Sequence, residues 1–335
     1  MSKLVIDTDG LFDDVRAVVL ALTHPKAVVL ALTTVSSSSE MPVEQVVANL
    51  SRIRRLLNKP KVPIYRGSSD ALVSKQKRQG AAFFFGKDGI GDRPDQEPTL
   101  TADDQAAFVA NISAAQALRS LAETLPGEIT LVCLGPLTNV ALALKQQPQV
   151  ASKFQRIIIM GGSLWAIGNV ENSTAEFNFH ADPEAANIVL KEMKCPVKIV
   201  PWDLYLSLGI PHRIAVDPSL DTNDHLRLNT PISRFLSAIS KFPGAVGERK
   251  GRRLSFCDEI AVAVALEPDI ASESRNVHVA VELQGQWTRG QMIVYWAAEY
   301  LIEHDGPDVL PRVQVVTNYD VKRVSDLLLD AVKSV

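Results

Sequence analysis

Short apolar runs alternate with amphipathic segments along most of the 335-residue chain. The runs are rich in Val, Ile and Leu, which is typical of parallel strands whose two faces are both covered. The other segments repeat their apolar residues every three or four positions, as amphipathic helices do. The predicted strands are residues 4–7, 27–35, 62–65, 128–134, 156–160 and 197–200. The predicted helices are residues 14–23, 43–57, 112–125, 137–145, 183–193, 229–242, 258–266 and 319–332.

This alternation of strand and helix predicts an α/β fold with a mostly parallel central sheet flanked by helices. Three late apolar segments, 276–283, 292–296 and 312–316, look like strands of a small antiparallel addition. Residues 66–110 are polar, contain glycine and have no regular pattern, so we expect loops around a site. Because no repeat or linker interrupts the chain, we expect one domain over residues 1–335.

Composition excludes several classes of protein. Hydrophobic residues make up 46% and charged residues 22%, as in ordinary globular proteins. The net charge is −3 and the basic clusters at 75–80 and 248–253 are short, so nucleic-acid binding is not expected. The sequence has neither a bilayer-length apolar stretch nor a signal-peptide pattern, so we expect no membrane association and a cytoplasmic location. Cys133, Cys195 and Cys257 are too widely spaced for a disulfide framework or zinc site.

Four carboxylates crowd the segment DTDGLFDD, directly after the first predicted strand: Asp7, Asp9, Asp13 and Asp14. Like charges at short range oppose each other's ionisation, and the segment holds neither lysine nor arginine. Asp13 and Asp14 alone could favour the N-terminus of the following helix. The whole set is better explained by a hard cation with oxygen ligands.

Polar and glycine-rich segments also follow three other predicted strands. TTVSSSSE covers residues 33–40, GPLTN follows Leu134, and a long polar segment beginning GGSLW follows Met160. In open α/β sheets, ligands bind beyond the carboxyl ends of the strands. The sequence therefore predicts a binding site where these segments meet the aspartate cluster.

A series of motifs in order along the chain resembles the nucleoside hydrolases, the inosine-uridine-preferring family. The segments that carry the resemblance are DTDGLFDD (7–14), LGPLTNVALAL (134–144), MGG (160–162), GNVENSTAEFNFHADPEAA (168–186), FCDEIAVAVAL (256–266) and QGQWTRGQMIVYW (284–296). The resemblance implies an α/β sandwich around a parallel-rich sheet. It also implies Ca²⁺-dependent hydrolysis of the N-glycosidic bond of ribonucleosides to base and ribose, in nucleoside salvage or catabolism, by a homodimer or homotetramer.

The resemblance further implies a role for each matching residue. The implied calcium ligands are Asp9, Asp14, Asp258 and the backbone carbonyl of Leu134. Asp9 is the expected general base. The implied partners of the ribose are Asp13 at the 2′-hydroxyl, Asn178 at the 3′-hydroxyl, Asn169 and Glu176 at the 5′-hydroxyl, and Met160 and Phe177 against the sugar. The expected catalytic set is Asp9, Asn169, Glu176 and Asn178. Asp258 is also expected to contact substrate, and Asp7 to orient ligands.

Three positions depart from the family pattern. Ser38, which the resemblance implies as a substrate-binding residue, stands where asparagine is common, and Phe85 stands where the active-site loop often has histidine. Cys257 precedes the late aspartate, where histidine or tryptophan is usual. The base preference and the group that activates the leaving base therefore stay open. His180 is expected to pack rather than to act on the base, and Trp165 is the best-placed tryptophan to stack on it.

Two other functions must be weighed. The opening VIDTDG also resembles haloacid-dehalogenase-type phosphatases, with Asp7 as nucleophile and Mg²⁺ as metal, but the later lysine and acidic pair of that family are missing. A non-catalytic, calcium-dependent nucleoside- or ribose-binding protein would keep the same acidic cluster.

Overall fold

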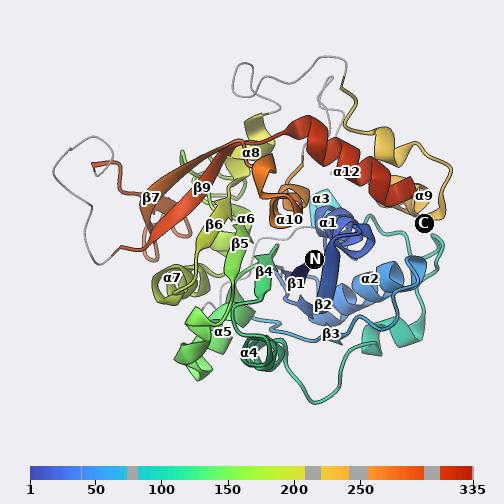
Figure 1. Cartoon of the computed structure of the whole chain (residues 1–335), viewed down its shortest axis with the longest axis horizontal. Coiled ribbons are helices and arrows are strands. Elements are labelled where there is room, and N and C mark those ends of the chain that lie inside the picture. Colours follow the sequence, from blue (N-terminus) through green and yellow to red (C-terminus); the bar gives the residue numbers. More distant parts are fainter. Residues whose placement is uncertain (39, 74–81, 208–219, 241–255, 298–309, 334–335) are drawn as a thin grey trace.

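A nine-stranded sheet forms the centre of the computed structural model, which describes residues 1–38, 40–73, 82–207, 220–240, 256–297 and 310–333 (Figure 1). The strand order is β3-β2-β1-β4-β5-β6-β9-β7-β8. The strands are β1 (Ser2–Thr8), β2 (Ala27–Thr34), β3 (Ile64–Tyr65), β4 (Ile129–Cys133), β5 (Arg156–Met160), β6 (Val197–Val200), β7 (Glu273–Val281), β8 (Met292–Val294) and β9 (Arg312–Asn318). The mostly parallel α/β sheet expected from the sequence is confirmed.

The antiparallel addition extends the same sheet instead of forming a separate layer. β7 runs antiparallel to β9, and β8 runs antiparallel to β7. β9 joins the two parts, because it is antiparallel to β7 and also pairs in parallel with β6, through Lys198 with Gln314 and Ile199 with Val315. A run of apolar residues indicates a buried strand but carries no direction, because direction depends on where the preceding chain crosses the sheet.

Helices cover the sheet where the sequence predicted them, with ends shifted by a few residues. The helices are α1 (Phe12–Thr23), α2 (Val43–Leu56), α3 (Ala82–Phe85), α4 (Ala114–Thr124), α5 (Thr138–Gln146), α6 (Phe177–Ala181), α7 (Pro183–Glu192), α8 (Trp202–Ser207), α9 (Pro231–Ile239), α10 (Asp258–Leu266) and α12 (Val321–Lys333). α4 begins late because the Ser113 hydroxyl caps it by accepting from Gln116 N. α3, α6 and α8 were not predicted, since helices this short show no amphipathic repeat.

Some expectations lie outside the described residues. These are the basic clusters at 75–80 and 248–253 and the last two residues of the helix predicted for 229–242. Within the described ranges, none of the helices has both the length and the apolar character required to cross a lipid bilayer.

The side chains of each strand alternate between two hydrophobic cores. Leu4 and Ile6 of β1 pack with α1, α2, α9, α10 and α12, whereas Val5 packs with α4, α5 and α7 on the other face. Figure 1 shows these two groups of helices on opposite sides of the sheet. Because both faces are covered, the central strands are apolar on both sides, which explains the continuous apolar runs of the sequence.

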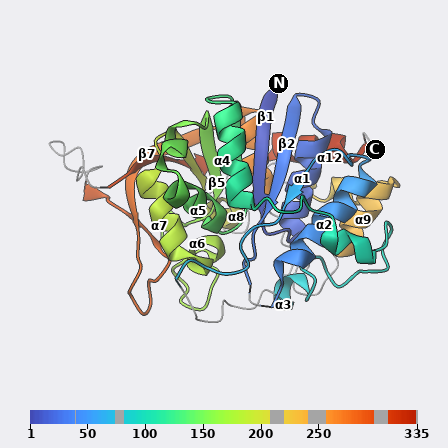
Figure 2. The same cartoon turned by 90° about the horizontal axis from the view of Figure 1, so that it is seen from below.

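The strand order reverses between β1 and β4. The chain moves outward from β1 to β2 and β3, and then returns to place β4, β5 and β6 on the other side of β1. Such a reversal opens a crevice at the carboxyl ends of the two strands, where α/β proteins bind ligands. The N-terminal start of β1 lies at the opposite end of the sheet from the short helices α3 and α6 (Figure 2).

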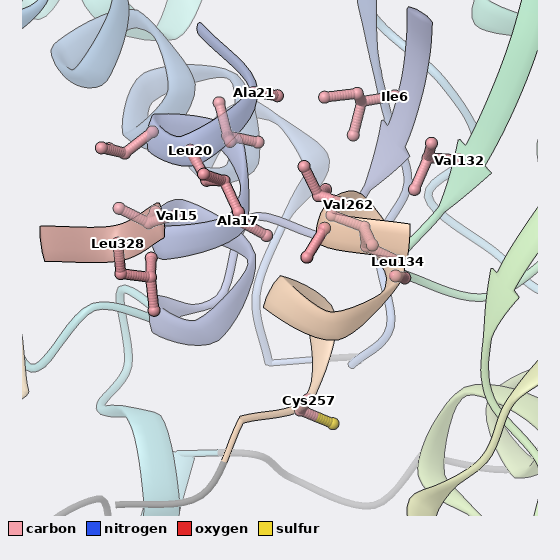
Figure 3. Close-up of a cluster of buried hydrophobic side chains, with 14 of the residues drawn as sticks. Ile6, Val15, Ala17, Leu20, Ala21, Val132, Leu134, Cys257, Val262 and Leu328 are labelled. Carbon is pink, nitrogen blue, oxygen red and sulfur yellow. The ribbon is translucent and has the colours of Figure 1, made fainter. Parts of the chain in front are cut away.

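A buried ion pair joins α1 to α10. Arg16 Nε of α1 lies 2.6 Å from Glu259 Oε1 of α10, and both side chains are almost completely buried. The Arg16 guanidinium also lies over the Phe12 ring, 4.9 Å from its centroid. Around it, apolar residues of the two helices pack together, including Val15, Ala17 and Val262 (Figure 3). The pair therefore fixes two helices that both begin at the crevice.

Arg16→Met should lower the free energy of unfolding by about 3–5 kcal/mol, because it leaves the Glu259 carboxylate buried without its partner. Urea denaturation would measure this. Lys322→Met, which breaks an exposed pair with Asp326 on α12, is the control and should change the free energy of unfolding far less, because solvent screens an exposed pair. An Arg16→Met protein as stable as this control would contradict the prediction.

Candidate active site

Three carboxylates meet at the crevice. The ligand oxygens of Asp13, Asp14 and Asp258 lie within 4.8 Å of one another. Asp13 and Asp14 are in the first turn of α1, and Asp258 is the first residue of α10. Asp14 and Asp258 are buried, while Asp13 is half-buried. Residues more than 240 positions apart in sequence are thus brought together by the packing of α1 on α10.

The turn between β1 and α1 is built to hold this arrangement. Gly10 has φ +65°, a left-handed conformation that glycine adopts readily, and an added Cβ would come 2.8 Å from Val46 Cγ1. The Thr8 hydroxyl donates to Asp14 and accepts from Gly10 N at 3.1 Å. The turn therefore fixes Asp14 before any ligand binds.

Burial opposes ionisation of the whole group. Burial, together with the charges of neighbouring carboxylates, raises the pKa of Asp14 and of Asp258 well above the ordinary range. Burial and the Glu259 carboxylate raise the pKa of Asp13 to about 7. One oxygen each of Asp13 and Asp258 is buried without a hydrogen-bond partner among the described residues. Buried, unpartnered carboxylate oxygens in a like-charged group are the donor set that a hard cation requires, so these residues fit a metal ion.

Asp9 lies beside this group. Its carboxylate is buried next to Asp14 and Ser37, yet neither oxygen makes a hydrogen bond of good geometry within the described chain. Its charge raises the pKa of Asp14 and Asp258, and burial raises the pKa of Asp9 itself. Of the predicted metal ligands, the structure therefore brings Asp14 and Asp258 together with Asp9 adjacent, and it adds Asp13 to the acidic group.

Glu176 and Asn178 link the ends of the next strands to α6. Glu176 caps this helix, because its carboxylate accepts from Asn178 N at 2.7 Å and Phe179 N at 3.1 Å. It also accepts from Gly162 N at 2.9 Å. Burial raises the pKa of Glu176 to about 7, although these three N–H groups favour the ionised form.

The Asn178 amide continues this network toward the aspartates. Its Nδ2 donates to the Leu134 carbonyl at 2.8 Å, at the end of β4. It also lies 3.3 Å from the carbonyl of Met160, the last residue of β5. The predicted carbonyl ligand, Leu134, thus contacts a predicted ribose-binding residue directly.

The remaining predicted ribose residues lie around the same strand ends. Asn169 follows β5 in the long loop, and its Oδ1 is buried with no hydrogen-bond partner among the described residues. Phe177 is the half-buried first residue of α6. Ser38 is buried after β2, and its hydroxyl accepts from Glu40 N at 3.2 Å. The short Ser38 side chain therefore makes its hydrogen bond within the loop that follows β2.

Asp7 holds the scaffold beneath the site. Its Oδ1 accepts from the Thr33 hydroxyl at 2.5 Å and from Asn139 Nδ2 at 2.8 Å. Asn139 also donates to the Thr34 carbonyl at 2.8 Å, so it joins β1, β2 and the start of α5. Sequence reasoning missed Asn139, although its place in GPLTN after a strand could have suggested it. A fully buried Asp7 held in this way fits an orienting role, not that of a phosphatase nucleophile.

The other side of the crevice is aromatic and apolar. Phe85 packs on Phe12, with ring centroids 5.2 Å apart. Cys257 is buried just before α10, and burial raises the pKa of its thiol well above the ordinary range. Trp165 belongs instead to the loop after β5, where it is 47% exposed and stacks on Trp296, with centroids 4.8 Å apart and planes 8° from parallel.

Comparison with known proteins decides the family. The model of the inosine-uridine preferring nucleoside hydrolases matches residues 4–326. The chain belongs to this family. It is therefore a nucleoside hydrolase, an enzyme that cleaves N-glycosidic bonds, and the resemblance seen in the sequence is confirmed.

Relatives span different base preferences. Uridine nucleosidase 1 of Arabidopsis thaliana is 31% identical over 84% of this chain and 79% of its own length. The pyrimidine-specific ribonucleoside hydrolase RihA of Shigella boydii is 30% identical over 98% of both chains. Among solved structures, an inosine-guanosine nucleoside hydrolase is 30% identical with a TM-score of 0.82 over both whole chains. A plant nucleoside hydrolase, PpNRh1, is 28% identical with a TM-score of 0.82, over 99% of this chain and 98% of that chain.

The unfolding free energy of the metal-free nucleoside hydrolase should decrease as the pH rises from about 4 to about 7. Burial raises the pKa of Asp7 and of Glu176 to about 7, whereas carboxyl groups in an unfolded chain titrate near 4. In this window the folded state holds protons that the unfolded state has released, so each group weakens folding by up to about 1.4 kcal/mol per pH unit.

Urea denaturation in the presence of a chelator would measure this slope. Glu176→Gln should make the slope shallower, because one of the buried groups with a raised pKa is gone. A Glu176→Gln protein with the same slope as the unmodified protein would contradict the assignment.

Proposed function

We propose that this nucleoside hydrolase cleaves ribonucleosides, with purine or pyrimidine bases, in a calcium-dependent reaction that gives free base and ribose in nucleoside salvage or catabolism. The observation that carries the proposal is the buried group of carboxylates with unpartnered oxygens, next to Glu176 and Asn178. Family membership supports ribonucleoside hydrolysis. The identity of the metal and the role of each residue are our assignments.

Asp9, Asp14, Asp258 and the Leu134 carbonyl would hold the calcium ion. All four are oxygen donors at the ends of β1 and β4 or at the start of helices packed beside them, and Ca²⁺ prefers an all-oxygen shell. The Leu134 carbonyl has a second lone pair for the metal, because Asn178 uses one. Bound Ca²⁺ would supply the positive charge that lets these carboxylates ionise together and would lower the pKa of nearby water.

Ribose would be held by the polar groups that surround this site. Half-buried Asp13 would accept from the 2′-hydroxyl, and Asn178 would contact the 3′-hydroxyl. Asn169 and Glu176 would hold the 5′-hydroxyl, and the unpartnered Asn169 Oδ1 is ready to accept this hydrogen bond. Met160 and Phe177 would pack against the sugar. Such contacts orient the glycosidic carbon toward the attacking water.

Asp9 would act as general base. Both Asp9 oxygens are buried without a hydrogen-bond partner in the described chain, so one can bind the metal while the other accepts a proton from water. Transfer of a proton from water to Asp9 would leave a hydroxide nucleophile, which attacks the oxocarbenium-like ribosyl centre as the N-glycosidic bond breaks and the base departs with the bonding electrons.

We also propose one domain, a homodimer or homotetramer, and a cytoplasmic location. The single family match over residues 4–326 supports the first of these. Light scattering coupled to size exclusion would measure the oligomeric state.

The function is tested by incubating the purified protein with a panel of nucleosides and following free base by chromatography and ribose by a reducing-sugar assay. We expect both products in equal amounts. A chelator should stop the reaction, and Ca²⁺ should restore it. Nucleoside binding in calorimetry without product would favour the non-catalytic alternative. Activity restored by Mg²⁺ but not by Ca²⁺ would contradict the assigned metal.

2′-Deoxynucleosides should react at least ~10³-fold more slowly than ribonucleosides. A buried site built to bind a hydroxyl rejects a substrate that lacks it, because Asp13 would then lose its partner. The measurement compares kcat/KM for uridine and 2′-deoxyuridine. Similar values for the two would show that Asp13 does not bind the 2′-hydroxyl.

Cys257→Ala should lower kcat by less than ~10-fold, whereas Asp9→Ala should lower it by more than ~10³-fold, since general base and metal ligand are lost together. A buried thiol with a raised pKa is ionised little at neutral pH and serves chiefly as a small apolar group. Neither Phe85 nor Cys257 is expected to protonate the departing base, so the rate should depend on how readily the leaving group departs without a proton. p-Nitrophenyl riboside should therefore be a good substrate relative to inosine. Equal loss of activity in both variants would refute this view of Cys257.

A further inference from the structure

The loop that carries Asn169 and Glu176 is held at its start by α8, where the Asp203 carboxylate accepts from Leu164 N at 2.7 Å and from Trp165 N at 3.2 Å. The loop leaves β5 and reaches α6 through residues 161–176, a stretch without a strand or a helix. Inside it, Gly168 N donates to the Ser173 carbonyl at 2.9 Å and Asn169 N to the Ala175 carbonyl at 3.1 Å. These two bonds close the second half of the loop on itself, and its place on the rest of the molecule depends on other contacts.

A segment later in the chain anchors the second half of the loop. The connection between β7 and β8, residues 282–291, is termed the hairpin segment here; it lies beside α6 and α7 in Figure 2. Asn172 Nδ2 donates to the Arg289 carbonyl at 2.9 Å, and the Thr174 hydroxyl donates to the Trp287 carbonyl at 2.6 Å. Two side chains of the loop are thus bonded to the backbone of a segment more than 110 residues later.

The Asn172 side chain makes hydrogen bonds both to the hairpin segment and within the loop. While its amide donates to the hairpin segment, its Oδ1 accepts from Thr174 N at 3.2 Å and from Ala175 N at 3.1 Å. The same side chain therefore shapes the loop immediately before Glu176 and ties it to the hairpin segment. A change that removes only the donor would separate the two effects.

The hairpin segment is itself fixed to the helices that follow the loop. The Arg289 guanidinium donates twice to the Glu184 carboxylate of α7, at 2.8 and 2.9 Å. Gly290, with φ +84°, passes so close to α6 that an added Cβ would lie 2.7 Å from His180 Cα. His180 therefore meets the hairpin segment through its backbone, in keeping with the packing role expected for it.

We propose that the hairpin segment is a positioning clamp that sets the discrimination for the 5′-hydroxyl of ribose, acting through Asn172 and Arg289 on the loop that places Asn169 and Glu176. This inference rests on the proposed function. Neither Asn172 nor Arg289 is assigned a contact with substrate, so their effect is on geometry. Displacement of positioned groups by as little as about 1 Å can reduce rates by up to about 100-fold.

The test compares kcat/KM for uridine and for 5′-deoxyuridine in the full-length protein loaded with Ca²⁺. Asn172→Asp keeps the oxygen that accepts from Thr174 N and Ala175 N but cannot donate to the Arg289 carbonyl. Arg289→Met removes the two bonds to Glu184. In both variants the ratio of the two kcat/KM values should fall by at least ~10-fold, because only uridine carries the hydroxyl that the displaced groups would hold.

Arg323→Met is the matched control. Arg323 makes a similar twofold bridge to Glu267, at 2.6 and 2.7 Å, on α12 and remote in the fold from the loop. It should lower the melting temperature about as much as Arg289→Met and leave the substrate ratio within ~2-fold of the unmodified protein.

The outcomes distinguish a failure of the clamp proposal from a failure of the proposed function. If the unmodified enzyme prefers uridine and both variants keep that preference, or lose activity equally on both substrates, the clamp is refuted and the function stands. If the unmodified enzyme hydrolyses uridine but does not distinguish it from 5′-deoxyuridine, the clamp and the assigned roles of Asn169 and Glu176 are refuted together. An unmodified enzyme without activity on either substrate refutes the proposed function as well.

Discussion

Repulsion among buried carboxylates at the end of β1 is the constraint on which the rest of this structure depends. Asp9, Asp13 and Asp14 lie close to Asp258, and burial raises the pKa of each of them. Arg16, the cation on the same helix as Asp13 and Asp14, is already paired with Glu259. Such a group is tolerated only when protons or an external cation compensate it, and a site that stays charged at neutral pH therefore implies a metal.

Neutral hydrogen-bonding groups hold this unstable arrangement in place. Thr8 orients Asp14, while Thr33 and Asn139 orient Asp7 beneath the site. These groups fix the carboxylates without neutralising them. The negative charge of the carboxylates is therefore left to be compensated by a bound cation. A functional site of this kind lowers the stability of the metal-free fold, and the extensive apolar cores on both faces of the sheet offset that cost.

The two sides of the crevice differ in chemistry. On the proposed ribose side, carboxylates follow β1, and Glu176 and Asn178 are fixed by hydrogen bonds to backbone atoms, including the carbonyls of Leu134 after β4 and Met160 at the end of β5. On the other side, Phe12, Phe85 and Cys257 offer apolar surface and a thiol whose pKa is raised by burial. Specificity should therefore be strict for the sugar and looser for the base, and rate enhancement should arise mainly at the ribosyl centre.

The sequence by itself determined the central strands, the longer helices and the crowding of Asp7, Asp9, Asp13 and Asp14, because apolar periodicity and neighbouring charges are local properties of a chain. The ordered motifs also identified the family, since a series of matches over the whole chain carries more information than any one of them. Tertiary structure alone decided the direction of β9, the meeting of Asp13 and Asp14 with Asp258, the pairing of Arg16 with Glu259, and the contact of Asn172 with the hairpin segment. Each of these joins segments at least 100 residues apart, where the path of the intervening chain and the packing of helices on the sheet set the distance, and no local pattern records either.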